Sequence, residues 1–528
     1  MSLRECVSTL AHSIAALRGC DLPGLILVGD DGDTRIRSFG ELITAVEGFA
    51  ARLVARGVGR GERLAIAAPD PEYMVLATLA ALRAGAVPIA LADPSGESPE
   101  VWAAAALQVV RASGAHRVVR PSAARGPLPA LTGVRELMVD DLGEHPLGAV
   151  FLPDPASFRA DDLALVQFAA GGQGSPRATP YTQAALAAGC DALLGAALRA
   201  RPGDRVLSWI PLHQGLLGAV LAPLRHRVPF VIARPGPLDA GRWLRLTANL
   251  GVTITFAGAA TLEQPARPDP RLDLRRVRAL VCGGDVLALD VVRTFVDGHA
   301  AAGLDARALV PCFGAAASET PGQPLRIDRV APEAYSRDGF AAPLGHEQKD
   351  MSRSALEFVA RGRPLPGHRV EVVDRVGDPL GEREVGEVVV CGPSDDPSGR
   401  RTGHRGYLAE GRLYVTGRVD DVIVVHGCSY DPQPIEREAA RVPGICAGRV
   451  VALARPGKLT DELVVIAEGR PVDPAVLNTM TATLRRRIQA AIGLRVAALV
   501  QVPVGALPRT TSGELQRAAA RARYLQLG

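Results

Sequence analysis

The sequence predicts an α/β fold: a large N-terminal domain with doubly wound sheets plus a small β-barrel-like subdomain, and a small mobile α+β C-terminal domain. Three observations lead to this prediction. The first 260 residues alternate helical segments with short apolar runs, as parallel sheets covered by helices require. Valine-rich runs separated by Gly and Asp turns follow after residue 360. The chain has 528 residues, 47% of them hydrophobic, which provides for more than one domain.

Hydrophobic periodicity places the elements of the large domain. Apolar residues at helical spacing predict helices at 39–56 and 71–83, and the apolar segments 63–68 and 85–91 are predicted strands. Six further apolar runs are predicted strands, at 163–168, 205–209, 228–232, 254–256, 279–281 and 308–311. Most of them lead into a helix through a Gly-rich or polar turn, which is typical of a parallel sheet.

The segment of about 360–418 differs in its residue pattern from the rest of the large domain. Short valine-rich strands are predicted at 370–373, 386–390 and 412–415. Because Gly and Asp turns separate them, they favour a small antiparallel, barrel-like unit.

A domain boundary is predicted just after this unit. Residues 1–418 would form the large domain, 419–421 a hinge, and 422–528 a small lid domain. For the lid we expect two strands, an amphipathic helix at 474–492 and a basic, loop-like tail.

Charge and composition exclude several classes of protein. The formal net charge is +4 among 60 basic and 56 acidic residues, which gives no nucleic-acid footprint. The most apolar stretch, 73–91, is interrupted by Arg83 and Pro88, so we expect no membrane span. Charged residues within the first twenty positions interrupt a signal-peptide core, and the eight cysteines lack metal-ligand spacing. We therefore expect a cytoplasmic location, reduced thiols and no metal site.

The segment 165–182 combines an apolar strand, a Gly-rich turn and a predicted helix that starts near Thr182. Backbone N–H groups of such a turn, together with a helix N-terminus, can hold phosphate. The turn residues concerned are Gly171, Gly172, Gly174 and Ser175, and Arg177 could add a cation. A plain structural turn remains the alternative, because the Walker pattern is missing.

Two later segments, 391–436 and 501–517, resemble the adenylate-forming superfamily of acyl-CoA synthetases, luciferases and adenylation domains. Those proteins carry a phosphate loop, an aromatic-Gly motif and TGD, GRxxD and PxTxSGK signatures in this order, and the order is kept here from about residue 39 to 517. Within the superfamily, the segments 209–218, 358–374 and 430–436 look most like fatty acyl-AMP ligases. The resemblance implies activation of a carboxylic acid with Mg·ATP to acyl-AMP, followed by transfer to the thiol of an acyl carrier protein.

The resemblance also implies a set of site residues. Gly283, Gly284 and Asp285, with Phe313, Gly314 and Arg418, would form the nucleotide pocket, and the Phe313 ring would stack on adenine. His213 matches a histidine that lines the acyl pocket, although a structural histidine is an equal alternative. Asp420 occupies the hinge position, with a solvated turn residue as the alternative.

The phosphate loop and the magnesium position depart from the family pattern. Ala169, Ala170, Gly172 and Gln173 stand where hydroxyl residues are expected, and Arg177 stands at the lysine position. Only Lys349 and Lys458 occur beside 58 arginines, so this exchange fits a general arginine bias. Ala317 replaces the carboxylate associated with magnesium, and Glu319 could compensate only in a longer loop. A role for Mg²⁺ is therefore doubtful.

Two further departures concern the ribose and the reacting phosphate. His404 replaces the carboxylate that would hold the ribose hydroxyls, and Glu514 replaces the terminal lysine of the family. Charge-stabilising contacts of this kind contribute on the order of 3–4 kcal/mol each in a transition state. We therefore expect weak binding of ATP or AMP and impaired ATP use.

Three functional hypotheses follow from these observations. The first is a divergent acyl-AMP ligase that still activates a carboxylic acid. The second is a non-catalytic pseudo-ligase that binds an acyl chain, a nucleotide or a carrier protein. The third is an enzyme that uses the same pocket for acyl transfer without ATP.

Overall fold

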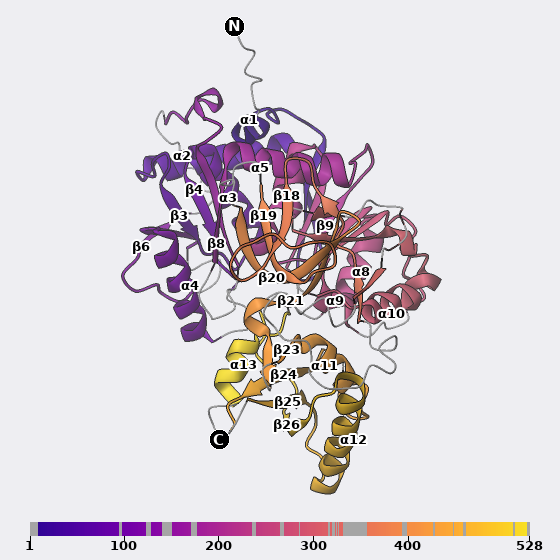
Figure 1. Cartoon of the computed structure of the whole chain (residues 1–528). Coiled ribbons are helices and arrows are strands. Elements are labelled where there is room, and N and C mark those ends of the chain that lie inside the picture. Colours follow the sequence, from indigo (N-terminus) through magenta and orange to yellow (C-terminus); the bar gives the residue numbers. More distant parts are fainter. Residues whose placement is uncertain are drawn as a thin grey trace.

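The computed structural model describes residues 9–93, 98–122, 128–139, 150–169, 177–234, 239–264, 269–284, 286–314, 317–318, 323, 325, 327–330, 356–392, 399–425, 428–446, 448–457, 461–510 and 513–524. The N-terminal part builds two sheets with helices between and around them (Figure 1). The larger has nine strands in the order β17-β14-β13-β12-β11-β9-β10-β1-β2. Their bounds are β1 Pro23–Val28, β2 Thr34–Ser38, β9 Val206–Ser208, β10 Phe230–Ala233, β11 Ile254–Gly258, β12 Ala279–Gly283, β13 Leu309–Phe313, β14 Ala317–Ser318 and β17 Arg363–Pro364. The six strands from β13 to β1 are parallel, and antiparallel strands lie at both edges.

The second sheet has the order β4-β3-β5-β6, and all of its pairings are parallel. Its strands are β3 Arg63–Ile66, β4 Val87–Ala90, β5 Arg117–Arg120 and β6 Arg135–Met138. Two parallel sheets with helical connections confirm the predicted fold class. The edge pair β1–β2 and the strands β5 and β6 are additions to the predicted set.

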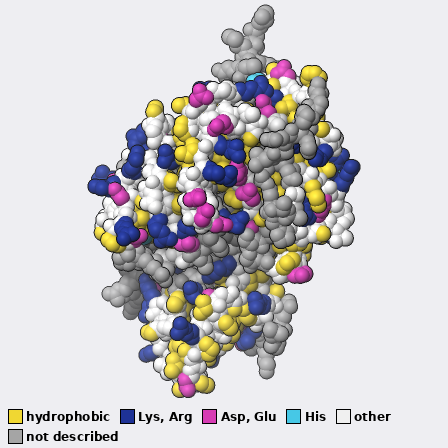
Figure 2. All heavy atoms as spheres, turned by 180° about the vertical axis from the view of Figure 1, so that it is seen from behind, with side chains coloured by type: hydrophobic (Ala, Val, Ile, Leu, Met, Phe, Trp, Pro, Cys, Tyr) yellow, Lys and Arg dark blue, Asp and Glu magenta, His cyan; other side chains and the backbone are white. Residues whose placement is uncertain are grey.

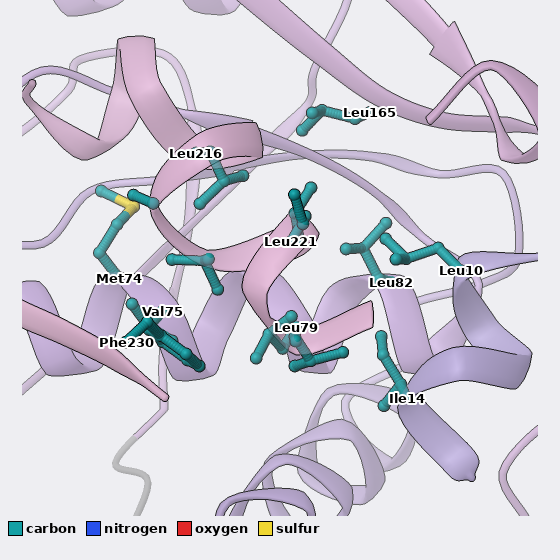
Figure 3. Packing of buried hydrophobic residues seen from close by; sticks show 14 of the residues in the cluster. Leu10, Ile14, Met74, Val75, Leu79, Leu82, Leu165, Leu216, Leu221 and Phe230 are labelled. Carbon is teal, nitrogen blue, oxygen red and sulfur yellow. The ribbon is translucent and has the colours of Figure 1, made fainter. Parts of the chain in front are cut away.

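The main hydrophobic core lies between the two sheets. Helix α3 (Pro71–Ala84) contacts β3 and β4 of one sheet and β10 of the other, so nearly all of its residues are buried. Helix α2 (Phe39–Ala55) covers α3 and begins with a capping box between Ser38 and Glu41. Figure 3 shows how α3 packs with α1 (Leu10–Ala15) and with Leu216 and Leu221, which lie in the helical segments after β9.

The remaining helices of the large domain connect the strands. They are α4 Pro99–Ser113, α5 Gln183–Cys190, η3 Asp191–Ala197, α6 Leu212–Leu216, η4 Leu217–Leu221, α7 Ala222–Arg225, α8 Ala240–Asn249, α9 Ala259–Leu262 and α10 Leu289–His299. Short 3₁₀ turns are η2 Pro155–Ser157, η5 Ala300–Ala302 and η6 Ala306–Ala308.

The Gly-rich segment differs from the prediction. Strand β7 (Leu163–Ala169) pairs with an antiparallel strand β8 (Arg177–Thr182), and α5 begins only after β8. Thr182, the N-cap of α5, pairs with Leu163 at the end of the hairpin remote from the Gly-rich turn. The predicted helix start near Thr182 is confirmed, but it does not lie beside the turn as expected. Strand β8 was not predicted because it contains Pro180, and proline argues against a strand unless the strand lies at an edge, as β8 does.

The valine-rich unit is an antiparallel sheet in the order β18-β19-β20-β21. Its strands are β18 Arg369–Val373, β19 Gly386–Cys391, β20 Arg400–Ala409 and β21 Arg412–Arg418. A second antiparallel pair, β15 (Ile327–Val330) and β16 (Leu356–Val359), lies alongside β21 through a bridge between Ala360 and Tyr414.

A short 3₁₀ turn, η9 (Val419–Asp421), leads into the small C-terminal domain, drawn in orange and yellow in Figure 1. This domain contains β22 Ile423–Val425, β23 Cys428–Tyr430, α11 Pro432–Ala440, β24 Val450–Arg455, β25 Glu462–Glu468, α12 Pro474–Ile492, β26 Val496–Val502 and α13 Arg517–Tyr524. Its helices and strands share a hydrophobic core of their own, and none of its described strands joins the two large sheets. The tail predicted as a loop contains α13, and β26 adds a parallel strand to the predicted pair.

Two further findings concern membrane-spanning helices and metal sites. No helix among the described residues is long and apolar enough to cross a membrane. Within the same residues, no group of three or more His, Cys, Asp or Glu side chains is arranged to hold a metal ion.

Candidate functional site

The candidate site lies at the carboxyl ends of the neighbouring parallel strands β12 and β13. Strand β12 ends at Gly283 and β13 ends at Phe313, and each is followed by a glycine with positive φ, +101° at Gly284 and +55° at Gly314. Residues other than glycine rarely adopt this backbone conformation. Two turns without side chains therefore leave the backbone open at an edge where α/β sheets generally bind ligands.

Three predicted residues from distant motifs meet beside these turns. The rings of Phe313 and His404 are 5.1 Å apart and nearly perpendicular, with an interplanar angle of 89°. His404 in β20 pairs in register with Arg418 at the end of β21, and Nη1 of Arg418 lies 3.5 Å from Nε2 of His404. The structure thus groups an aromatic ring, an imidazole and a guanidinium next to the strand ends.

The tail of the small domain reaches the same place. A β-carbon added to Gly284 would lie 2.8 Å from Oε1 of Glu514, so this carboxylate is in contact with the Gly284 turn. A tight hairpin holds Glu514: the N–H of Thr510 donates to the Glu514 carbonyl (2.8 Å), and the N–H of Glu514 donates to Oγ1 of Thr510 (3.1 Å). The glutamate at the position of the family's lysine therefore faces the candidate site.

Arg177 stands at the start of β8, where the hairpin meets β20. Its Nη2 donates to the carbonyl of Arg401, and its Nη1 would lie 2.9 Å from a β-carbon on Gly403. The exposed guanidinium of Arg177 therefore contacts β20 at Gly403, the residue before His404.

His213 lies in α6, just after β9, and is only partly exposed. Burial of its imidazole lowers its pKa to about 4, and the nearby carboxylate of Asp93 opposes this shift. A neutral ring at physiological pH can accept or donate a hydrogen bond but carries no charge.

Three groups remain to be placed: the hinge residue Asp420, two cysteines of β12 and β13, and the residues outside the described part of the chain. Asp420 is exposed in η9, whereas its neighbour Asp421 is buried. Burial raises the pKa of Cys282 to about 12 and that of Cys312 to about 11, so both thiols are protonated in the core. Several predictions lie outside the described residues: Ala170, Gly171, Gly172, Gln173, Gly174, Ser175, Asp285 and Glu319.

Sequence reasoning missed the buried charges around the hinge. Arg405 pairs with Asp431 at 2.9 Å, and Arg517 pairs with Asp421 at 3.0 Å and with Glu436 at 2.7 Å. The sequence shows arginine and carboxylate residues in the motifs on both sides of 419–421. Which of these residues pair depends on the tertiary structure.

Two layered parallel sheets, an antiparallel unit and a small α+β domain whose tail reaches the strand ends define an adenylate-forming type of protein. The chain belongs to the AMP-binding enzyme family, whose model matches residues 16–395.

Full-length relatives agree with this assignment. A Caulobacter vibrioides protein described as a candidate acyl-CoA synthetase is 29% identical, with 98% of each chain covered. The long-chain-fatty-acid–AMP ligase FadD28 of Mycobacterium tuberculosis is 25% identical, with 90% of each chain covered. A solved structure from a study of fatty acyl-adenylate ligases of E. coli and L. pneumophila has a TM-score of 0.83 at 24% identity, with 98% of each chain covered, and so shares the fold.

Proposed function

We propose that this chain is a divergent fatty acyl-AMP ligase-like protein. In this proposal it activates a carboxylic acid as an acyl-adenylate for transfer to a carrier-protein thiol, with impaired ATP use. The observation that carries the proposal is the convergence of Phe313, His404 and Arg418 beside the Gly284 turn. The name of the relative FadD28, a long-chain-fatty-acid–AMP ligase, supports the substrate class.

The residues at the strand ends fit an adenine nucleotide. The partly exposed Phe313 ring offers an aromatic surface on which a purine can stack. The backbone at Gly314 has open space beside it, and the guanidinium groups of Arg177 and Arg418 suit phosphate oxygens. The nucleotide would supply the phosphoryl group to which the carboxylate becomes attached.

The same site explains why ATP use would be impaired. His404 offers a ribose no paired oxygen acceptors, and Glu514 brings negative charge to the place where a phosphate would lie. Ala317 has no metal-binding side chain, and the described residues contain no carboxylate cluster for Mg²⁺. These features support weak nucleotide binding.

A second function is favoured by the contact of Glu514 with Gly284. A carboxylate that faces the nucleotide position is suited to a protein that binds AMP or an acyl group without turning ATP over. This alternative shares the pocket with the first and differs only in chemistry.

The two functions are separated by measuring binding and turnover together. Calorimetry with AMP tests the pocket, and ATP–pyrophosphate exchange with a panel of fatty and other carboxylic acids tests activation. We expect measurable AMP binding and slow exchange that depends on one class of acid. Binding without exchange would select the second function, and the absence of both would contradict the proposal.

Two variants test the assigned pocket directly. Phe313→Leu removes the stacking ring and should weaken AMP binding by about 1–3 kcal/mol. His404→Asp restores paired acceptors and should tighten it by about tenfold. The matched control is Phe151→Leu, because Phe151 is 88% exposed and no site contact is assigned to it. Equal affinities of Phe313→Leu and Phe151→Leu would place the nucleotide elsewhere.

A further inference from the structure

A group of buried charges connects the two domains across the predicted hinge. The exposed fractions of the side chains are 1% for Arg405, 3% for Asp431, 8% for Arg517, 9% for Asp421 and 10% for Glu436. Charged side chains are rarely buried to this extent unless they are paired.

The pair between Arg405 and Asp431 joins two separate cores. Arg405 lies in β20 of the antiparallel unit, and its Nη1 donates to Oδ1 of Asp431 at 2.9 Å. Asp431 precedes α11, whose Ile435 and Ala439 pack into the core of the small domain. Gly417, near the end of β21, lies against the same carboxylate, so the contact has little free space.

Arg517 extends the connection to the tail and to the hinge turn. Its guanidinium donates two hydrogen bonds to Glu436, of 3.1 and 2.7 Å, and one to Asp421 in η9, of 3.0 Å. Arg517 follows Glu514 by three residues, so the same charges also fix the segment that carries Glu514.

A rotation of the small domain about 419–421 would have to separate Arg405 from Asp431. The rotation would therefore break an ion pair that is shielded from water and would pull apart the close packing of Asp431 against Gly417. We propose that Arg405 and Asp431 are positioning residues that latch the small domain in the orientation that puts Glu514 at Gly284. The latch acts on domain orientation and is independent of the chemistry proposed above.

A second contact between the domains provides a probe of this orientation. A β-carbon built on Gly448 of the small domain lies 4.0 Å from Cβ of Glu263, which follows α9 in the large domain. This separation is within the range of a disulfide. The double variant Glu263→Cys/Gly448→Cys should therefore cross-link in the latched orientation, and its melting temperature is measured first because Gly448 has a φ of +69°, where cysteine is strained. Cys446 is exposed nearby, so Cys446→Ser is added to every protein to prevent a competing disulfide.

The experiment measures the initial rate of disulfide formation in the full chain under mild oxidation. With Arg405 and Asp431 present, we expect rapid cross-linking. Asp431→Asn in the same background should slow it by about tenfold. The matched control is Arg455→Met, which removes an ion pair of 2.7 Å within the small domain, and it should leave the rate within about twofold.

A further variant separates latching from folding. Because Asp431→Asn leaves Arg405 buried without a carboxylate, the protein can lose stability for that reason alone. Arg405→Leu/Asp431→Leu removes both charges and should restore the melting temperature while cross-linking stays slow. Rapid cross-linking in the folded double variant would overturn the latch. Absence of cross-linking in the parent would overturn it as well, because the observed orientation would then not be populated.

Discussion

The carboxylate of Glu514 touches the Gly284 turn, next to the ring of Phe313 at the end of the neighbouring strand. A glutamate at this position has two explanations: a tail that no longer enters the site, or a reaction without an acyl phosphate. The contact removes the first explanation for this orientation of the domains. In our proposal, the negative charge of Glu514 therefore repels the phosphate of a nucleotide that binds at the strand ends.

Glu514→Lys tests how far the site has diverged. An ammonium group in this place would offset charge that accumulates on a reacting phosphate. Because His404 and Ala317 remain, we expect ATP–pyrophosphate exchange to stay near the level of the parent. Glu514→Gln, which removes the charge without reversing it, is the control. A gain of about tenfold or more from the lysine variant, equal to about 1.4 kcal/mol, would contradict this expectation.

His213 gives a prediction about pH. Its pKa is about 4 in the folded protein, below the ordinary value of 6.5 of the unfolded chain. The unfolded state therefore binds a proton first, and stability falls as the pH drops from about 6.5 towards 4. This contribution should be at most about 1.4 kcal/mol per pH unit, since a single proton is involved.

Urea titrations of the parent and of His213→Gln at pH 7.5 and 5.0 provide the measurement. The parent should lose more stability on acidification than the variant does. Equal losses in the two proteins would show that His213 is protonated as readily in the folded state as in the unfolded chain.

At the scale of elements, the hairpin β7–β8 matters because it brings Arg177 and Thr179 to β20. Arg177 donates to the Arg401 carbonyl, and Nη1 of Arg400 donates to Oγ1 of Thr179 at 2.9 Å. These contacts, rather than a helix N-terminus, direct the start of β8 towards His404. The positive charge at this side of the site therefore comes from arginine side chains.

Arg177→Gln should consequently affect phosphate-rich ligands most. Loss of one partly screened charge should weaken ATP binding by about three- to tenfold, while adenosine binding should be unchanged. Calorimetry with both ligands at low salt checks this expectation, and Arg363→Gln, in the edge strand β17, serves as an arginine control. Equal weakening for adenosine and ATP would show that Arg177 supports the fold of the site rather than the phosphate.

At the scale of the whole molecule, the two domains have separate hydrophobic cores, and buried ion pairs connect them. The visible face of the molecule in Figure 2 carries interspersed basic and acidic side chains, in keeping with a net charge of +4. The small domain (422–528) has 14 basic and 8 acidic residues and is net positive, while the rest of the chain is slightly negative. This attraction does not specify a direction, so the specific buried contacts decide the orientation of the domains.

Arg517→Met should unfold the small domain before the large one. It leaves Asp421 and Glu436 buried without their cation, which costs about 3–5 kcal/mol. Differential scanning calorimetry should then show a separate transition at lower temperature, while the main transition stays in place. Arg455→Met should leave the profile unchanged. A single transition that shifts as a whole would show that the domains unfold as one unit.

Local patterns in the sequence determined much of this protein. The helical periodicity of 474–492 predicted α12 with its observed bounds, and the predicted helix at 39–56 agrees with α2 to within one residue. The order of the motifs gave the family, and the strand ends with glycine marked the site. Periodicity and motif spacing are properties of neighbouring residues, so a single sequence contains them.

The tertiary structure alone decided which distant residues meet. The contact of Glu514 with Gly284 and the pair of Arg405 with Asp431 join separate elements, and local spacing carries no information about them. The hairpin β7–β8 was missed for a related reason, since its second strand is defined by pairing rather than by apolar alternation. Burial and charge pairing arise only when the elements pack, and for that reason the sequence supplied the candidate residues while the fold determined their partners.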